Sequence, residues 1–243
     1  EKKEEGKQEE QLENFDVKHN AYWTEEVQVK VNDKEKWVNE FLIGENIGRG
    51  AFSKVKQVIR TFKSDEGNDE QKEFAMKMMH KPTLKRERAM RYNDSGEMEM
   101  INNLDKVYNE VEIWASLHHD NLVTLYEIID SEEHDYMYLI LEMADLGQLA
   151  KWDFEKEVYV LNQGILQYLA QALQTENIEE MARFLFQQLG TAILHLHEEA
   201  RVIHRDIKLD NILFDGHHGL VKLTDFTVSR DNIGEATRLF DSQ

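Results

Sequence analysis

Four polar side chains near the end of the chain have the types and spacing that phosphoryl-transfer chemistry requires. Asp206 supplies an acid, Lys208 supplies a cation, and Asn211 and Asp225 supply hard oxygen atoms. Mg²⁺ is bound in proteins by one or two carboxylates together with phosphate oxygens, and the last two residues suit that chemistry. A base, a cation and a metal site in one place would stabilise the charge on a transferred phosphoryl group.

A β-hairpin is expected to bring these residues together. Two apolar runs, 212–214 and 220–223, flank a turn-rich sequence at 215–219, which is typical of a hairpin with a five-residue loop. The open ends of a hairpin lie side by side. Asn211 just before the hairpin and Asp225 just after it are therefore predicted to be neighbours.

The sequence His-Arg-Asp-Ile-Lys-Leu-Asp-Asn at 204–211, with Asp225-Phe226 downstream, resembles the catalytic loop and magnesium motif of eukaryotic protein kinases. Asp-Phe alone would more often be a chance surface pair, but the complete block is specific. The resemblance implies that Asp206 accepts or orients the substrate hydroxyl proton and that Lys208 steadies the γ-phosphoryl group. It also implies that Asn211 and Asp225 hold Mg²⁺. A lysine two residues after the catalytic aspartate is the serine/threonine arrangement.

The segment 41–60 is predicted to form a strand, a glycine turn and a second strand. Gly48 and Gly50 would let backbone N–H groups approach phosphate oxygens. A lone Gly-x-Gly is usually a simple turn, and the third glycine of the kinase pattern is replaced here by Ser53. The resemblance implies that Phe52 caps this loop and that Ile47 and Val55 cover the adenine ring.

A strand lysine is the next candidate. Lys77 follows Ala75 in the short apolar run 74–79, as in the kinase Ala-x-Lys pattern, where the lysine holds the α- and β-phosphates. A lysine in an alternating strand is otherwise usually exposed. The segment 107–117 is predicted to be an amphipathic helix, with Glu110 beside its apolar face. The sequence His-His-Asp-Asn-Leu-Val at 118–123 fixes the register of this helix against the kinase pattern, so the resemblance implies that Glu110 pairs with Lys77 and orients it toward phosphate.

Two further strands, at 122–129 and 136–142, complete a predicted five-stranded antiparallel small lobe. The sequence Tyr-Leu-Ile-Leu-Glu-Met-Ala at 138–144 resembles the kinase hinge. The resemblance implies that Leu141 is the gatekeeper and that the Glu142 carbonyl and the Ala144 amide bond adenine. It also implies that Gln148 contacts the ribose and that Leu213 belongs to the nucleotide site. It also implies a stack that joins the lobes, made by His204, Phe226, Trp114 and Leu125.

The expected fold is α+β, a bilobal protein kinase-like fold. Its antiparallel β-sheet small lobe, 37–143, carries one regulatory helix, and its partial, mainly helical large lobe covers 144–243. Residues 1–36 are expected to be an acidic extension, disordered at its start and strand- or arm-like near Val27, Val29 and Val31. The chain ends soon after the magnesium motif, which predicts truncation within the activation segment.

Four other segments carry weaker predictions. The segment 64–72 is expected to be a polar loop. The insert at 81–106 is expected to be a charged surface loop, with a docking surface for an acidic partner as the alternative. A helix is expected around 165–173. Another begins at Asn177, where Glu180 would complete a capping box.

Composition excludes several classes of function. A net charge of −19 argues against nucleic-acid or anionic-membrane binding, because phosphate recognition needs clustered cations. The absence of cysteine excludes disulfides and thiolate metal sites and fits a cytoplasmic protein, with the nucleus as an alternative. There is no apolar run near membrane-spanning length.

Three stretches narrow the resemblance. The sequences at 37–41, 107–113 and 122–142 resemble the calcium/calmodulin-dependent protein kinase kinase group, which acts upstream of AMP-activated kinase. The resemblance implies an ATP- and Mg²⁺-dependent serine/threonine kinase that activates another kinase, in signal transduction, by phosphorylating its activation loop. In that group the calmodulin-binding segment follows the kinase domain, so calmodulin control would lie outside this chain.

Two alternatives stay open. Thr227 stands where kinases usually have glycine after Asp-Phe, and the substrate platform is missing, so a nucleotide-binding pseudokinase or scaffold without phosphotransfer is one alternative. A small-molecule kinase is the other, and the spacing of Lys208 and the hinge disfavour it.

Overall fold

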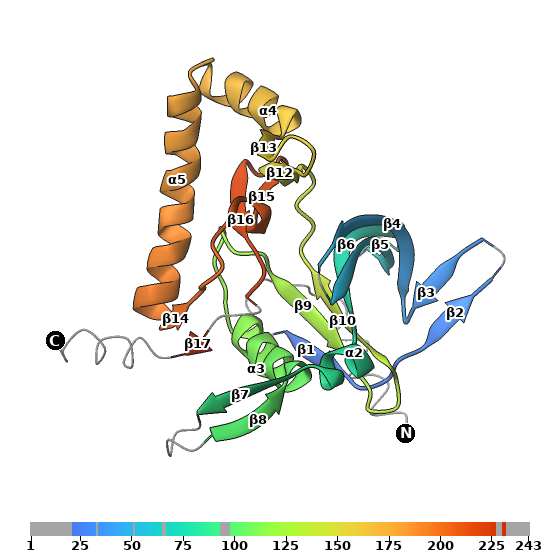
Figure 1. Cartoon of the computed structure of the whole chain (residues 1–243). Helices are drawn as coiled ribbons and strands as arrows, with labels where there is room; N and C mark the ends of the chain where they lie inside the picture. The colour runs from blue at the N-terminus through green and yellow to red at the C-terminus, as the bar shows by residue number, and fades with distance from the viewer. Residues whose placement is uncertain are drawn as a thin grey trace. The chain divides into compact units, whose positions relative to one another are not determined.

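The computed structural model describes residues 21–32, 34–50, 52–64, 67–92, 98–226 and 230–231. The segment expected to be disordered at the start of the chain and Thr227 lie outside the described residues. The chain divides into two compact units: residues 1–89 with 125–142, and residues 90–124 with 143–243 (Figure 1). Residues 90–124 are grouped with the second unit, although the sequence placed them in the small lobe.

The first unit is built on one eight-stranded sheet with the strand order β1-β9-β10-β6-β5-β4-β3-β2. Its central five strands are antiparallel, as predicted: β4 (Phe41–Arg49), β5 (Ser53–Lys63), β6 (Asp69–His80), β9 (Leu125–Ile129) and β10 (Tyr136–Leu141). Three short strands lengthen it: β1 (Tyr22–Thr24), β2 (Val29–Val31) and β3 (Lys36–Val38). β1 lies parallel to β9. The sheet therefore has three more strands than the five that the sequence predicted.

The β5–β6 hairpin is longer than its sequence suggested. The prediction of a polar loop at 64–72 was wrong in its second half, because β6 begins at Asp69 and pairs there with Lys63. Residues 69–73 of β6 are polar and exposed, so this part of the strand carries no apolar pattern, although Phe62 near the end of β5 still packs against the hydrophobic cluster. An exposed ion pair of 2.6 Å joins Lys63 Nζ to Asp69 Oδ1 at the first pair of the ladder.

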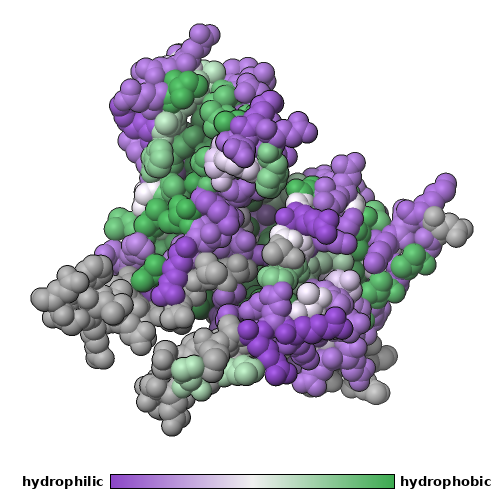
Figure 2. Space-filling view, viewed as in Figure 1, coloured by the Kyte–Doolittle hydropathy of each residue, from purple (hydrophilic) through white to green (hydrophobic). Residues whose placement is uncertain are grey.

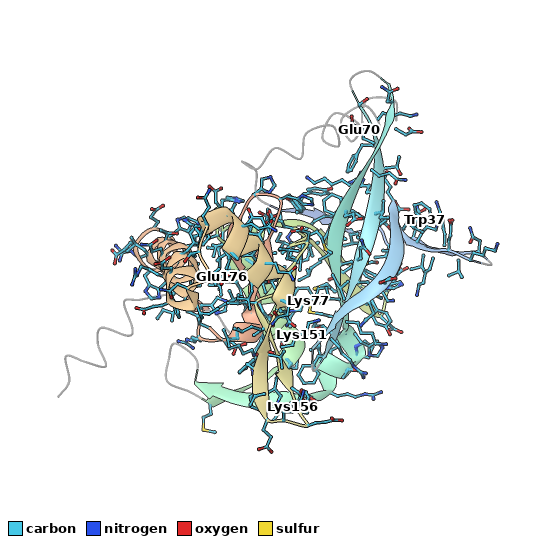
Figure 3. The ribbon with its side chains drawn as sticks, turned by 90° about the horizontal axis from the view of Figure 1, so that it is seen from above. Trp37, Glu70, Lys77, Lys151, Lys156 and Glu176 are labelled. Atoms are coloured by element: carbon cyan, nitrogen blue, oxygen red, sulfur yellow. The ribbon has the colours of Figure 1, made fainter. Side chains whose placement is uncertain are left out.

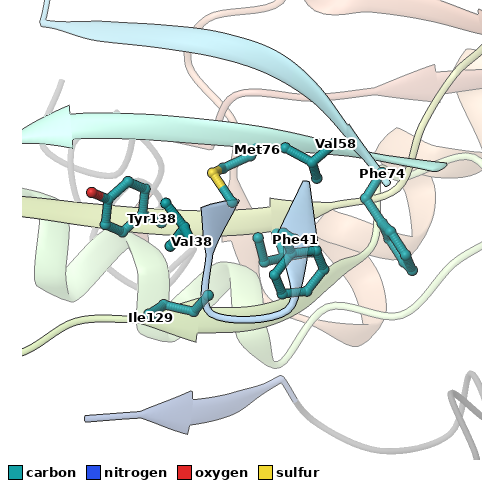
Figure 4. Close-up of a cluster of buried hydrophobic side chains, with 8 residues drawn as sticks. Val38, Phe41, Val58, Phe74, Met76, Ile129 and Tyr138 are labelled. Carbon is teal, nitrogen blue, oxygen red and sulfur yellow. The ribbon is translucent and has the colours of Figure 1, made fainter. Parts of the chain in front are cut away.

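A buried hydrophobic cluster covers one face of this sheet (Figure 4). Phe41 meets Phe74 edge to face, with ring centroids 5.9 Å apart. The remaining members come from β3, β5, β6, β9 and β10: Val38, Val58, Met76, Ile129, Tyr138 and Ile140. Because side chains alternate along a strand, the odd-numbered neighbours of Val58, Met76 and Ile140 lie on the opposite face.

The charged segment after β6 is structured, which corrects the prediction of a surface loop at 81–106. It contains α2 (Lys81–Arg86), β7 (Arg88–Tyr92) and β8 (Met98–Asn102), and α3 already begins at Asn103. Pro82 lies in the first turn of α2, where its missing N–H is harmless. Lys81 is 5% exposed and binds Asp130, so part of the charge is buried rather than solvated.

The second unit combines helices with short sheets. The helices are α3 (Asn103–Ala115), α4 (Gln163–Leu173), α5 (Ile178–Leu194), the π-helical turn η1 (His195–Glu199) and the 3₁₀ turn η2 (Leu209–Asn211). A three-stranded sheet is formed by β11 (Gly147–Gln148), β15 (Ile212–Asp215) and β16 (Leu220–Leu223). Two strand pairs are added: β12 (Ala150–Asp153) with β13 (Val158–Leu161), and β14 (Val202–Ile203) with β17 (Arg230–Asp231).

Asparagine side chains cap the three long helices. Asn102 accepts a hydrogen bond from Asp105 N, Asn162 accepts one from Gly164 N, and Asn177 accepts one from Glu179 N at 2.9 Å. Such caps satisfy amides that have no partner within the helix. The predicted start of α5 at Asn177 is confirmed, although the capped amide is that of Glu179 rather than Glu180.

Hydrophobic side chains remain exposed along α5. Ile178, Phe186 and Leu194 are exposed, and Figure 2 shows hydrophobic surface over this helix. Met181, Leu189 and Ala192 of the same helix are buried, whereas Phe184 and Leu185 are partly buried. No helix in the described part of the chain is both long and apolar enough to span a membrane.

Candidate phosphoryl-transfer site

One carboxylate oxygen organises the loop between β14 and β15. Asp206 Oδ2 accepts hydrogen bonds from Lys208 Nζ at 2.7 Å and from Asn211 Nδ2 at 2.9 Å. Asn211 Nδ2 also donates to the Asp206 carbonyl oxygen at 2.8 Å. The bond to Asp206 raises the pKa of Lys208, so this cation stays charged. The acid, the cation and one predicted metal ligand are therefore held together.

A buried histidine fixes the backbone beside Asp206. His204 is 1% exposed; its Nδ1 accepts from Asp206 N at 3.2 Å, and its Nε2 lies 3.0 Å from the Thr224 carbonyl oxygen. An acceptor at Nδ1 and a carbonyl at Nε2 assign the neutral tautomer with hydrogen on Nε2. Burial lowers the pKa of His204, which also favours the neutral ring.

This histidine predicts a loss of stability in acid. The unfolded chain binds a proton on His204 near pH 6.5, whereas the folded state resists it because its pKa is lowered. The free energy of unfolding should therefore fall as the pH drops below about 6.5. We expect the urea midpoint of the wild type to fall further between pH 7.5 and 5.5 than that of His204→Asn. Parallel curves for the two proteins would contradict this assignment.

The predicted hairpin is confirmed and brings the two predicted metal ligands close together. β15 pairs with β16 from Ile212↔Leu223 to Asp215↔Leu220. The loop therefore has four residues, 216–219, rather than the predicted five, because Asp215 still belongs to the ladder. At the open end, Thr224 N donates to Asn211 O at 3.0 Å, and Asp225 is the next residue.

Two residues of the site have left-handed backbone conformations. Arg205 has a φ of 67° and Asp225 a φ of 64°. Such conformations cost of order 1–3 kcal/mol in non-glycine residues and persist where the surroundings enforce them. One immediately precedes Asp206 and the other is the predicted metal ligand. Four other described residues, Asn39, Glu157, Gln174 and Arg201, share this conformation, so it is not confined to the site.

Aromatic packing fixes the chain after Asp225. Phe226 is fully buried and contacts the ring of His204 edge to face at 4.9 Å and the ring of Trp114 at 5.3 Å. Trp114 is itself held by a 2.8 Å hydrogen bond from Nε1 to the Val123 carbonyl oxygen. These contacts confirm three members of the predicted stack. Leu125, the fourth, belongs to the first unit.

The glycine turn of the first unit is formed as predicted. Gly48 pairs with Val55 across β4 and β5, and Gly50 N donates to Ser53 O at 2.9 Å. A Cβ added at Gly50 would lie 2.7 Å from Ser53 Oγ, so the turn is tight at this point. Ile47 lies where the register shifts, and Phe52 is exposed in the turn.

The remaining predicted residues of the first unit share one sheet face. Lys77 lies opposite Val55 on one side and Leu139 on the other, while Ala75 lies opposite Leu141. Their common parity places them on the face opposite the hydrophobic cluster. Lys77, labelled in Figure 3, is only 8% exposed, unlike most strand lysines.

The predicted site residues fall into both units. The first contains Ile47, Gly48, Gly50, Phe52, Ser53, Val55, Ala75, Lys77, Leu141 and Glu142. The second contains Glu110, Ala144, Asp206, Lys208, Asn211, Leu213, Asp225 and Gln148. The pairing of Lys77 with Glu110 therefore stays a prediction. Gln148, expected at the ribose, uses its Nε2 to donate to Asp210 O at 2.9 Å.

The side-chain oxygens of Asn211 and Asp225 fit a magnesium ion that also binds phosphate oxygens. Asn211 Nδ2 makes the contacts to Asp206, and no described residue donates a hydrogen bond to Asn211 Oδ1. Together with the Asp225 carboxylate this gives two hard oxygen groups. The described residues contain no cluster of three or more histidine and acidic side chains that could hold a metal ion. The fit is thus to a metal shared with a phosphate ligand.

Comparison with known proteins agrees with this geometry. Residues 41–240 match the protein kinase domain family, and the chain belongs to that family. Its antiparallel-rich sheet unit and helical unit are consistent with the bilobal α+β fold of protein kinases.

Serine/threonine-protein kinases are among its relatives. It is 28% identical over 197 residues to a probable serine/threonine-protein kinase of Dictyostelium discoideum, covering 81% of this chain and 23% of that protein. CBL-interacting serine/threonine-protein kinase 24 of Arabidopsis thaliana is 30% identical, with 81% and 34% covered. Serine/threonine-protein kinase GRIK1 of the same plant is 31% identical, with 82% and 41% covered. The chain thus spans less than half the length of these relatives.

Proposed function

We propose that the protein is an ATP- and Mg²⁺-dependent serine/threonine kinase that transfers the γ-phosphoryl group of ATP to a protein hydroxyl. The observation that carries the proposal is the convergence of Lys208 and Asn211 on one oxygen of Asp206. That arrangement leaves the carboxylate beside a fixed cation and next to the predicted metal ligands. Its family membership supports the same chemistry.

Each polar residue then has a role. Asp206 orients the substrate hydroxyl and accepts its proton through Oδ1, which takes no hydrogen bond from the described residues, whereas Oδ2 binds Lys208 and Asn211. Lys208 balances negative charge on the transferred group. Such catalysis works mainly by positioning and electrostatic stabilisation.

The family resemblance also assigns residues to the nucleotide and to the metal. Asn211 and Asp225 would hold Mg²⁺, which supplies positive charge that neutralises the phosphate oxygens when bound. Lys77, paired with Glu110, would contact the α- and β-phosphates. The turn at Gly48 and Gly50 would offer backbone N–H groups, and the face that holds Val55, Ala75 and Leu141 would cover adenine, with Glu142 and Ala144 as its backbone partners.

A narrower assignment follows from the resemblance alone. We propose a kinase of the calcium/calmodulin-dependent protein kinase kinase group, acting upstream of another kinase in the cytoplasm. The motifs at 107–113 and 122–142 support the group, and the absence of cysteine fits the compartment. Control by calmodulin would require a segment outside this chain.

Transfer of labelled phosphate tests the proposed function. Purified protein, ATP labelled at the γ-phosphoryl group and Mg²⁺ should label a protein substrate on serine or threonine, as judged by phosphoamino-acid analysis. EDTA should abolish the labelling, because Asn211 and Asp225 suit a metal that phosphate shares. Lys77→Met should lower the apparent affinity for ATP at an unchanged melting temperature.

Three results would count against the proposal. Labelling of free small molecules in preference to protein would indicate another class of kinase. Phosphotyrosine as the main product would contradict the serine/threonine assignment. Tight nucleotide binding without turnover would favour the scaffold alternative.

A further inference from the structure

The β12–β13 hairpin lies beside the catalytic loop and is firmly attached at its base. Leu149 N, just before β12, donates to Ile212 O of β15 at 2.9 Å, and Asn162 N, just after β13, donates to Leu149 O at 3.0 Å. Ala150 at the start of the hairpin is fully buried. Lys151 and Lys156 mark the hairpin in Figure 3. Its base is therefore tied to the strand that directly follows Asn211.

Two side chains from this region bind the same residue of the η2 turn. Tyr159 Oη on β13 donates to Asp210 Oδ2 at 2.8 Å, and Gln148 Nε2 on β11 donates to Asp210 O at 2.9 Å. Asp210 directly precedes Asn211, whose side chain binds both the carboxylate and the carbonyl of Asp206. A movement of Asp210 would therefore displace Asn211 and, through it, Asp206.

The hairpin itself fixes the ring of Tyr159. Trp152 is its cross-strand partner, and the two rings meet edge to face with centroids 5.1 Å apart. Cross-strand aromatic pairs of this kind stabilise a two-stranded sheet. Trp152 and Tyr159 are 38% and 40% exposed, so this pair rather than burial orients the tyrosine ring. Tyr159 therefore presents its hydroxyl to Asp210 from an ordered position.

We propose that Tyr159 is a positioning residue, which holds the 209–211 turn so that Asn211 keeps Asp206 in place. Its consequence for phosphoryl transfer rests on the proposed function, whereas the contact is a property of the fold. Two-stranded hairpins are marginally stable alone. The backbone hydrogen bonds of Leu149 and Asn162 hold the β12–β13 hairpin in place, so that Tyr159 can restrain the η2 turn.

Hydrogen exchange tests the contact without any assay of activity. The reporters are the Asn211 and Thr224 amides, which donate to Lys208 O and Asn211 O at 3.0 Å each. Tyr159→Phe keeps the aromatic pair and removes the hydroxyl. Loss of one hydrogen bond of about 1 kcal/mol corresponds to roughly fivefold faster exchange at these amides. The matched control is Tyr168→Phe on α4, whose ring packs on Phe214 instead.

A double-mutant cycle assigns the effect to one pair of residues. Asp210→Ala should speed exchange at the same amides, and Tyr159→Phe should add nothing in that background. Asp210→Asn retains an acceptor and should resemble the wild type. Additive effects, exchange no faster than in Tyr168→Phe, or acceleration spread over α5 would each overturn the proposal.

Kinetics then test the consequence for transfer. Tyr159→Phe should lower kcat about fivefold while the KM for ATP changes less than about twofold, because the contact acts on Asp206 and not on the nucleotide. An unchanged kcat would overturn the positioning role. If the wild type transfers no phosphate, the proposed function fails, and the exchange experiment still decides whether Tyr159 holds the turn.

Discussion

Asp206→Ala should abolish protein phosphorylation while leaving the fold intact. The carboxylate is the candidate base, and it also holds Lys208 Nζ and Asn211 Nδ2. Removing a general base lowers rates by about 10²–10⁴, and losing an aligned electrostatic contact lowers them by about 10²–10³. We expect kcat to fall at least a hundredfold, as measured by steady-state transfer of labelled phosphate.

The stability of this variant should change little. Asp206 is partly exposed, with a side-chain exposure of 32%, and Asn211 Nδ2 keeps its bond to the Asp206 carbonyl oxygen. Asp206→Asn separates the two roles of the carboxylate, because it still accepts hydrogen bonds but is a poor base. It should be almost as inactive as Asp206→Ala. Glu157→Gln, on the exposed hairpin turn, removes one charge elsewhere and should stay active. Substantial activity in Asp206→Asn would show that Asp206 only aligns its neighbours.

Local sequence patterns were sufficient for the catalytic loop. Asn211 and Asp225 are brought together by one short hairpin, and its apolar runs and turn residues are adjacent in sequence. The amphipathic pattern of α3 and the cap at Asn177 are likewise local signals. Such features depend on few distant contacts, so they could be predicted, apart from one residue in the length of the hairpin loop.

Features set by tertiary contacts could not be predicted. Lys81 belongs to a charged segment whose sequence suggests an exposed surface. It contributes to the fold because it is buried in an ion pair with Asp130. Nothing in the pattern around Tyr159 indicates that its hydroxyl reaches Asp210, 51 residues away. β1 joins the sheet beside β9, about a hundred residues later in the chain, through Tyr22 and Thr24, whose hydroxyls both donate to the buried carboxylate of Glu127. A single sequence does not show such distant partners.

Asp130→Ala should destabilise the first unit strongly, because it would leave a buried cation without its carboxylate. Lys81 Nζ donates to Asp130 Oδ1 at 2.7 Å and to Ser131 O at 2.5 Å, and the two charged side chains are only 6% and 10% exposed. Removing one partner of a buried ion pair costs about 3–5 kcal/mol. That is a large fraction of the roughly 5–15 kcal/mol by which a domain is stable.

Urea unfolding measures this loss, and the chain offers a matched control. Asp69→Ala removes the partner of Lys63, where both side chains are largely exposed, so it should cost no more than about 1 kcal/mol. In the double variant Lys81→Met with Asp130→Leu, neither charge remains buried, and stability should return toward that of the wild type. If Asp130→Ala is no more destabilising than Asp69→Ala, the Lys81–Asp130 pair is not what anchors α2 to the segment between β9 and β10. A large loss that the double variant reverses would show that charge burial, rather than packing volume, sets the stability of this region.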